Sequence, residues 1–281
     1  LVEAAVLVTR VAREVPGYVS WQYPANEVGG VDAGPHEILL RAERRDGSPL
    51  DDDLLTVTVY MRKSGTVERC TLPIDFIVAT DAIAEEDVDE SIERLAIGVS
   101  GFYRSVGVEI PEYGVSRNPF PTMTVEEDGD LTEAAHALGS VLRDALANGR
   151  AREDALHVFV VRSLGTGLNG YSMGLPGPVS GDWPSAGVLV STTSFAAGNV
   201  LSPEMMAVST AHEVGHYLGL YHTSEQDAFH DPISDTPECE RGGLCSDEAF
   251  RRNLMTPGGS PERYIVTPGQ GAVIRRHPLC Q

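Results

Sequence analysis

The sequence predicts an α+β fold on the strength of three observations. From residue 71 onward, short apolar runs that suit strands alternate with segments whose apolar residues repeat at helical spacing. A further helix follows them and carries a histidine-rich motif. After residue 222 the apolar periodicity is lost. With 281 residues, of which 42% are hydrophobic, the chain can build one sizeable core and a small additional module.

We expect a domain boundary at residue 70. Residues 1–70 contain short alternating segments at 6–11, 18–23, 38–42 and 55–61, with turn signals at Asp46-Gly47 and Lys63-Ser64-Gly65. This pattern predicts a small β-rich N-terminal module. A retained pro-segment would show the same pattern, so both interpretations stay open. Residues 71–281 form the main domain.

The main domain is predicted to alternate strands and helices. An apolar run at 74–79 predicts a buried strand, and a helical face repeats from Val88 to Val106 and ends at Gly107. The other expected elements are a strand at 108–115, a helix at 132–148, an apolar strand at 157–161, a Gly/Pro-rich loop at 165–187 and a short strand at 187–192.

The motif H-E-x-x-H-x-x-G-x-x-H at residues 212–222 specifies a metal site. His212 and His216 are one helical turn apart, so both imidazoles can reach one metal from the same helix face. Gly219 can adopt the positive φ that ends a helix, which brings His222 back as a third ligand. Three nitrogen ligands leave the fourth position of a tetrahedral zinc open, as in a catalytic site, with Glu213 beside the metal.

The residues before the motif predict that it lies on a helix. Ser202 can cap the N-terminus, Pro203 suits the first helical position, and Glu204 complements the helix dipole. This agreement argues against the alternative interpretation, a helix that merely carries surface histidines.

Further along, Asn253-Leu254-Met255 precedes a Pro-Gly-Gly turn, and here the chain resembles the metzincin metallopeptidases. Met255 matches the methionine that those enzymes place in a tight turn beneath the metal. The resemblance covers residues 71–281 and implies a zincin-like catalytic domain with a mixed twisted sheet, an active-site helix and an irregular C-terminal subdomain. Within the metzincins the chain is most similar to the pappalysin family, through Thr223, Asp235-Thr236-Pro237, Cys239, Cys245 and Thr267-Pro268-Gly269-Gln270.

The chain departs from that family at Pro257. Relatives often carry a tyrosine at this position, two residues after the methionine, where it helps to stabilise the oxyanion. Tyr264 could serve in its place or could simply pack, and the sequence favours packing.

Together these features predict a zinc-dependent endopeptidase. Peptide bonds would be hydrolysed through a zinc-bound water, with Glu213 as the general base. The resemblance places an antiparallel edge strand above the cleft at residues 187–192, where an extended polypeptide substrate could pair with free backbone groups. The alternative is a non-catalytic protein-binding module that retains zinc, in which the N-terminal β-rich unit does the recognising.

Three carboxylates after the motif could bind a second metal. Asp227, Asp231 and Asp235 are spaced four residues apart and could collect a calcium ion through oxygen ligands. Solvated carboxylates would give the same spacing, so both interpretations stay open.

The four cysteines predict two disulfides. Cys239 and Cys245 are near enough in sequence to close a small local loop, which leaves Cys70 to meet Cys280 and to tie both ends of the main domain together. The alternative is that Cys70 is a latency thiolate that occupies the fourth zinc position.

Composition restricts the partners and the compartment. The net charge of −20, from 41 acidic and 21 basic residues, argues against nucleic acid and anionic membranes as partners. No segment approaches the roughly 20 apolar residues that cross a bilayer, so no membrane span is expected. Paired cysteines suit an oxidising compartment, and we expect an exported protein, either secreted or held in the cell envelope or periplasm.

Overall fold

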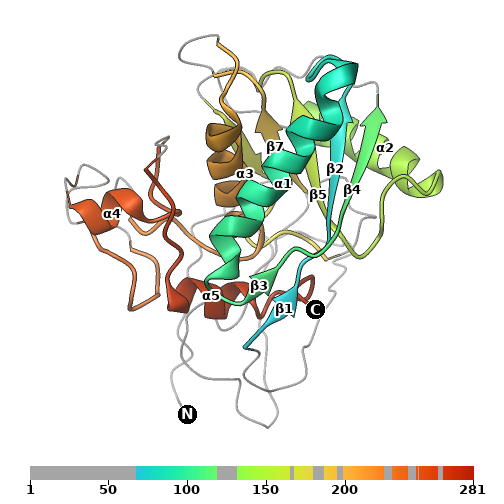
Figure 1. Ribbon diagram of the computed structural model, residues 1–281. Coiled ribbons are helices and arrows are strands. Elements are labelled where there is room, and N and C mark those ends of the chain that lie inside the picture. Colours follow the sequence, from blue (N-terminus) through green and yellow to red (C-terminus); the bar gives the residue numbers. More distant parts are fainter. Residues whose placement is uncertain are drawn as a thin grey trace, which may run out of the picture.

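The computed structural model describes residues 68–118, 132–164, 168–179, 187–194, 199–224, 230–239, 245, 247–258 and 262–281. Nearly all of the expected module at residues 1–70 lies outside these ranges, so the division into two units remains a prediction. In the described part, the α+β fold expected from the sequence is present (Figure 1).

A five-stranded, mostly parallel sheet forms the centre of the domain, in the order β4-β2-β5-β7-β6. Its four parallel strands pair β4 with β2, β2 with β5 and β5 with β7, and only β6 is antiparallel. A second small sheet pairs β1 with β3 in parallel. The strands are β1 (Cys70–Thr71), β2 (Ile74–Ala79), β3 (Val108–Glu109), β4 (Tyr113–Asn118), β5 (Leu156–Val161), β6 (Gly170–Ser172) and β7 (Val188–Ser191).

Helices cover both faces of the central sheet. A short 3₁₀ helix, η1 (Glu85–Asp87), leads into α1 (Val88–Arg104), which lies with α3 (Pro203–Tyr217) on one face, while α2 (Thr132–Ala147) lies on the other (Figure 1). Successive strand residues face opposite sides, so Phe76 and Val78 join the core under α1 and α3, and Ile77 joins the core under α2. The continuous apolar runs in the sequence reflect this burial on two faces.

The helices α1 and α3 approach each other closely. A Cβ atom added at Gly98 of α1 would lie 2.5 Å from the Cβ of Ala207 in α3, so a larger residue at either position would separate the helices. The buried Tyr103 hydroxyl at the end of α1 donates a hydrogen bond to the carbonyl of Ala211. α1 therefore supports α3 at the residue before the histidine motif.

Most of the expected elements are confirmed, including α1 ending before Gly107 (φ 77°), α2 ending before Gly149 (φ 65°), and the interior strands β2 and β5. The expected single strand at 108–115 is wrong. It splits into β3 and β4 around Pro111, which has no N–H to donate to a strand ladder.

The edge strand was also expected in the wrong place. β7 lies within the expected segment 187–192, but it pairs in parallel with β5 and is covered by β6, so it is an interior strand. The antiparallel edge is β6, inside the segment 165–187 that the sequence predicted as a loop. Three residues, Gly-Tyr-Ser, are too few to show a strand period.

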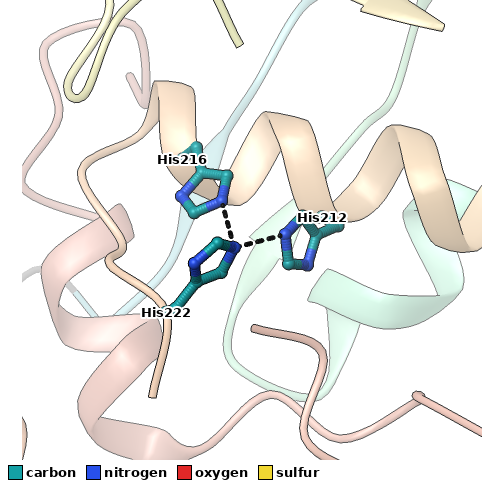
Figure 2. A group of neighbouring side chains, drawn as sticks. All are labelled: His212, His216 and His222. Carbon is teal, nitrogen blue, oxygen red and sulfur yellow. Dashed lines mark hydrogen bonds between the residues drawn. The ribbon is translucent and has the colours of Figure 1, made fainter. Parts of the chain in front are cut away.

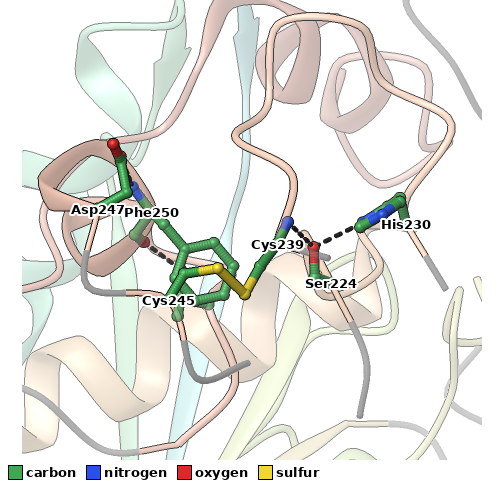
Figure 3. The surroundings of a disulfide bond; sticks show 7 residues. Ser224, His230, Cys239, Cys245, Asp247 and Phe250 are labelled. Atoms are coloured by element: carbon green, nitrogen blue, oxygen red, sulfur yellow. Dashed lines mark hydrogen bonds between the residues drawn. A yellow bond between two sulfur atoms is a disulfide. The ribbon is translucent and has the colours of Figure 1, made fainter. Parts of the chain in front are cut away.

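The last part of the chain is irregular, with two short helices, α4 (Glu248–Arg252) and α5 (Pro268–Ile274). The Cys239–Cys245 disulfide lies beside Ser224, whose Oγ accepts a hydrogen bond from the Cys239 N–H at 2.8 Å and lies 2.7 Å from His230 Nδ1 (Figure 3). This irregular segment is thus held to the residues that follow the histidine motif.

A second disulfide joins Cys70 to Cys280. Next to it, Thr71 and Gln281 exchange backbone hydrogen bonds of 2.7 and 2.9 Å, so the C-terminus is fixed against β1. Both pairs are the ones that the cysteine spacing favoured. Because Cys70 is oxidised to a disulfide here, the alternative role as a latency thiolate is not supported.

None of the helices in the described ranges is both long enough and apolar enough to cross a membrane.

Candidate active site

Three histidines converge at the C-terminal end of α3. His212 and His216 project from the helix, and His222 approaches them from the segment that follows (Figure 2). The Nε2 of His222 lies 3.2 Å from that of His212 and 3.1 Å from that of His216. Among the described residues, this is the only cluster of side chains suited to holding a metal.

The outer ring nitrogens of two of these histidines are fixed by backbone carbonyls. His212 Nδ1 lies 2.7 Å from the carbonyl oxygen of Leu254, and His216 Nδ1 lies 2.7 Å from that of Leu220. A carbonyl can only accept, so each Nδ1 carries the proton and each Nε2 presents a lone pair. This leaves His212 and His216 in the tautomer that a metal requires.

The nitrogen arrangement fits zinc. His222 has at most one proton to offer the two acceptors that face it, so hydrogen bonds alone do not account for the close packing of the three rings. Zn–N bonds of about 2.1 Å in a tetrahedron put neighbouring nitrogens about 3.4 Å apart, close to the separations found here. A divalent cation at the centre would satisfy all three lone pairs.

The turn after α3 forms as expected from the motif. Gly219 has a φ of 101°, a conformation that side-chain-bearing residues rarely adopt. Its N–H donates to the carbonyl of His216 at 2.9 Å, and the next N–H, of Leu220, donates to that of Gly215 at 2.9 Å. The helix thus ends one turn before His222.

Met255 packs against the motif helix. A Cβ atom at Gly215 would lie 2.6 Å from the Met255 sulfur, so this close contact depends on the absence of a side chain at that position. The Met255 N–H donates to Asn253 Oδ1 at 2.9 Å, and its carbonyl accepts from the Thr223 N–H at 3.1 Å. The methionine turn is therefore tied to the residue that follows the third histidine.

Two segments that the sequence singled out hold this turn in place. Asn253 and Gln270 exchange side-chain hydrogen bonds of 3.2 and 3.0 Å. Asp235 accepts hydrogen bonds from the Thr267 hydroxyl at 2.6 Å and from the Gly269 N–H at 2.9 Å. The late Thr267–Gln270 stretch is thus the capped start of α5, held by the Asp235 carboxylate.

The described residues give no support to the possible calcium site. Asp235 is engaged by α5, and Asp231 Oδ1 accepts hydrogen bonds from the Thr236 hydroxyl at 2.6 Å and from the Ile233 N–H at 3.0 Å. Asp227 lies outside the described residues. Both described carboxylates thus accept hydrogen bonds from the chain itself.

Glu213 lies beneath the edge strand. Its side chain is buried, and a Cβ atom added at Gly170 of β6 would lie 2.6 Å from Glu213 Cγ. The pKa of Tyr103 is raised well above its usual range, first by burial and then by the negative charge of Glu213. The buried side chain of Glu213 therefore packs against the backbone of β6.

Sequence reasoning missed one charged residue at this site, Arg263. Its side chain is 3% exposed, and its Nη1 lies 3.4 Å from His212 Nδ1. The pKa of Arg263 is lowered to about 10 by burial, which the charge of Glu213 opposes. No pattern marks a single arginine in an irregular segment. The neighbouring Tyr264 is 52% exposed, with Arg252 positioned 5.5 Å above its ring, so it packs at the surface.

Comparisons with known proteins agree with this geometry. A family model described as metallo-peptidase family M12 matches residues 75–265. An extracellular metalloprotease of Arthroderma gypseum is 26% identical over 182 residues, which cover 62% of this chain and 57% of that protein. One of Arthroderma otae is 28% identical over 164 residues, covering 58% and 55%. The chain thus spans less than two thirds of the length of these relatives.

Solved structures of similar shape include mirolysin in complex with compound 9, with a TM-score of 0.49, 16% identity, and coverage of 74% of this chain and 91% of that one. Metalloproteinase-II from Bacteroides fragilis has a TM-score of 0.43 at 16% identity, with coverage of 78% and 55%.

The family match runs from β2 to the residues just after Arg263, and it includes the complete histidine motif and Met255. It covers more than half of the chain and supports the general metzincin class. By this match the chain belongs to metallopeptidase family M12.

Proposed function

We propose that this protein is a zinc-dependent endopeptidase that hydrolyses peptide bonds in polypeptides, with Glu213 as its general base. The observation that carries the proposal is the convergence of three imidazoles, two of which have their outer nitrogens engaged by backbone carbonyls. Nothing comparable is found elsewhere in the described part of the chain.

His212, His216 and His222 would hold the zinc through their Nε2 atoms. Bound there, zinc would supply Lewis acidity, which lowers the pKa of a water molecule and polarises a carbonyl group. The carbonyls of Leu254 and Leu220 would hold the rings of His212 and His216 in the required orientation and make them more basic ligands. Met255, which is already packed against Gly215, would form an apolar base for the site without bonding to the metal.

Glu213 follows the first ligand directly and lies beside the site. Its carboxylate would accept a proton from the attacking water and would later return that proton to the leaving amine. Burial beneath β6 shields this carboxylate from bulk solvent, which strengthens its interactions during proton transfer.

The edge strand β6 supports a polypeptide as substrate. β6 pairs with β7 on one side, and an extended peptide could hydrogen-bond to its other side whatever the peptide's side chains are. Gly170 brings the β6 backbone within contact distance of Glu213. A peptide aligned on β6 would therefore pass directly over the general base.

Two further assignments belong to this proposal. Membership of the pappalysin branch is supported by the contacts of Asp235 with Thr267 and Gly269, which join two of the short matching segments. Export is supported by the two disulfides and by relatives that are named extracellular metalloproteases.

Two variants test the assigned roles. His216→Ala should lose the metal, because it removes a ligand. Glu213→Ala should keep about one zinc per molecule and lose about a hundredfold or more in turnover, because it removes only the proton acceptor. Metal analysis after mild dialysis, together with cleavage of a denatured generic protein, measures both effects.

The outcome also separates the endopeptidase from the alternative, a binding module that retains zinc. Cleavage by the wild-type protein that the Glu213→Ala preparation lacks would support the enzyme. A zinc-loaded wild-type protein that cleaves no more than this variant would favour the binding module. Equal metal loss in both variants would contradict the separate roles of His216 and Glu213.

A further inference from the structure

Arg263 is a buried cation that the proposed mechanism does not use. The guanidinium lies between the first histidine of the motif and the turn after Met255. One nitrogen is 3.4 Å from His212 Nδ1, and another would be 3.5 Å from a Cβ atom at Gly258. The side chain thus borders the site on which the proposed chemistry depends.

Arg263 has poor partners for a buried charge. Among the described residues, no carboxylate lies within 4.0 Å of its guanidinium, although ion pairs form elsewhere in that part of the chain. The guanidinium contacts His212 Nδ1, which already donates its proton to the Leu254 carbonyl and cannot accept another. Burying a cation with so few acceptors is costly, and an arrangement of this kind often marks a functional site.

The position of the Arg263 guanidinium suggests that a bound substrate would supply its hydrogen-bond acceptor. Arg263 contacts His212, whose neighbour in the sequence is Glu213, so an anion at the guanidinium would lie near the residues that would act on the scissile bond. Gly258 lies beside the guanidinium with a φ of 93°, and as a glycine it places no side chain over it. A polypeptide offers only one common anion of suitable shape, the carboxylate.

We propose that Arg263 is a specificity-determining residue, whose guanidinium receives a carboxylate of the substrate close to the scissile bond. This proposal rests on the endopeptidase function proposed above. A planar guanidinium can bind both oxygens of a carboxylate at once, which gives orientation as well as affinity. The carboxylate can come from an aspartate or glutamate side chain or from the free C-terminus of the peptide.

Because the whole chain is strongly acidic, a preference for peptides that carry a carboxylate would point to a local positive group. With a net charge of −20, the long-range field of the protein repels acidic peptides. A preference for a carboxylate would therefore have to arise from a local contact, and Arg263 is the buried cation at the proposed site.

The test uses matched quenched peptides with the zinc-loaded protein. One set has a blocked C-terminus and carries glutamate or glutamine at each position near the cleavage site in turn. A second set ends one to three residues after the scissile bond with either a free carboxylate or an amide. We expect the carboxylate member of one set to have a kcat/KM at least about tenfold above its neutral partner. The set that shows the effect identifies the source of the carboxylate.

Variants of Arg263 link the preference to this side chain. In Arg263→Gln the ratio between the paired peptides should fall to about one, and Arg263→Lys should restore part of it. The matched control is Arg251→Gln, which removes an exposed positive charge that pairs with Glu262 in the same region and should leave the ratio unchanged. If Arg263 had a purely structural role, its replacement would lower the melting temperature and would reduce kcat/KM for both peptides of a pair by the same factor. If Arg263→Gln does not fold, the ratio measured with Arg263→Lys decides.

Two results would overturn the proposal. One is an equal rate for acidic and neutral peptides at every position, and the other is a preference that persists in the Arg263 variants. If the wild-type protein cleaves nothing, the endopeptidase function fails. In that case, calorimetric binding of the same peptides decides about Arg263. Tighter binding of the carboxylate peptide that is lost in Arg263→Gln would support the anion site, and equal binding would refute it.

Discussion

At the scale of single residues, the site depends on glycines that allow close approach. Gly215 admits the sulfur of Met255 against α3, and Gly170 admits the side chain of Glu213 beneath β6. Neither glycine has a positive φ, so glycine is required at these positions by the lack of space for a side chain and not by the backbone conformation. The motif predicted His212, His216 and His222 from spacing, but these contacts involve residues far apart in sequence.

The substitution Gly170→Ala tests this close packing. The added Cβ atom would lie 2.6 Å from Glu213 Cγ and 3.2 Å from one carboxylate oxygen, so the general base must shift. A misplacement of about 1 Å can cost about a hundredfold in rate, and we expect a fall of that order in kcat with metal content unchanged. Steady-state kinetics and metal analysis measure the two quantities.

Gly101→Ala is the matched control, because no atom lies within 4 Å of the Cβ that it would add to α1. Activity should be unchanged, and stability should rise by about 0.5–1 kcal/mol because alanine favours the helix. If Gly170→Ala had full activity, the placement of Glu213 against β6 would be wrong.

At the scale of elements, the buried carboxylate of Asp75 joins neighbouring strands of the central sheet and forms an ion pair with the partly exposed Arg152. Asp75 lies near the start of β2 and accepts hydrogen bonds from the Gly114 N–H of β4 at 3.1 Å and from the Arg152 N–H, just before β5, at 2.6 Å. The Arg152 guanidinium also binds Asp75, at 2.6 Å, and this contact raises the pKa of Arg152. One carboxylate therefore links three neighbouring segments of the sheet.

Asp75→Ala should destabilise the protein by about 3 kcal/mol, because it leaves buried backbone donors and a charged partner without their acceptor. Urea unfolding followed by circular dichroism measures the change. Glu112→Gln is the control, since Glu112 is exposed and lies 3.8 Å from Arg152, and it should cost less than about 0.5 kcal/mol. Equal effects of the two substitutions would show that burial of Asp75 has no energetic consequence.

At the scale of the whole molecule, the C-terminal segment returns to the core at two places. The disulfide between Cys70 and Cys280 fixes it to β1, and His277 lies against α3 and the loop before β7. His277 is fully buried. Its Nε2 lies 3.3 Å from the Gly177 carbonyl, and its ring packs beside that of Tyr217, the last residue of α3. Burial lowers the pKa of His277 to about 4, against the opposing effect of the hydrogen bond to Gly177.

This burial predicts a loss of stability in mild acid. The unfolded chain binds a proton at His277 below about pH 6.5, whereas the folded chain does so only near pH 4. The stabilisation is therefore fully present above pH 6.5 and is lost as the pH falls toward 4, by about 3 kcal/mol in all. Urea unfolding at a series of pH values should show this slope, and His277→Gln should reduce it.

Other titrating groups do not obscure the comparison. The three motif histidines and the carboxylates are common to the wild-type protein and the variant, so their contribution cancels in the difference between the two curves. Parallel curves over this pH range would mean that His277 gains its proton without cost and that its burial is incomplete in solution.

The sequence by itself determined the α+β class, most helices and interior strands, and the histidines that converge on one point. These are local properties, since apolar periodicity, helix caps and an i, i+4 spacing act within a few turns of chain. The positive φ at Gly219 and the cysteine pairing also followed from residues and spacing.

Tertiary structure alone decided the rest. The edge position of β6, the pairing of Asn253 with Gln270 and the burial of Arg263 beside His212 each join residues that no sequence period connects. Such contacts depend on which segments the sheet and the disulfides bring together. The motif specifies the ligands, and packing around them determines which charges and backbone groups a substrate would meet.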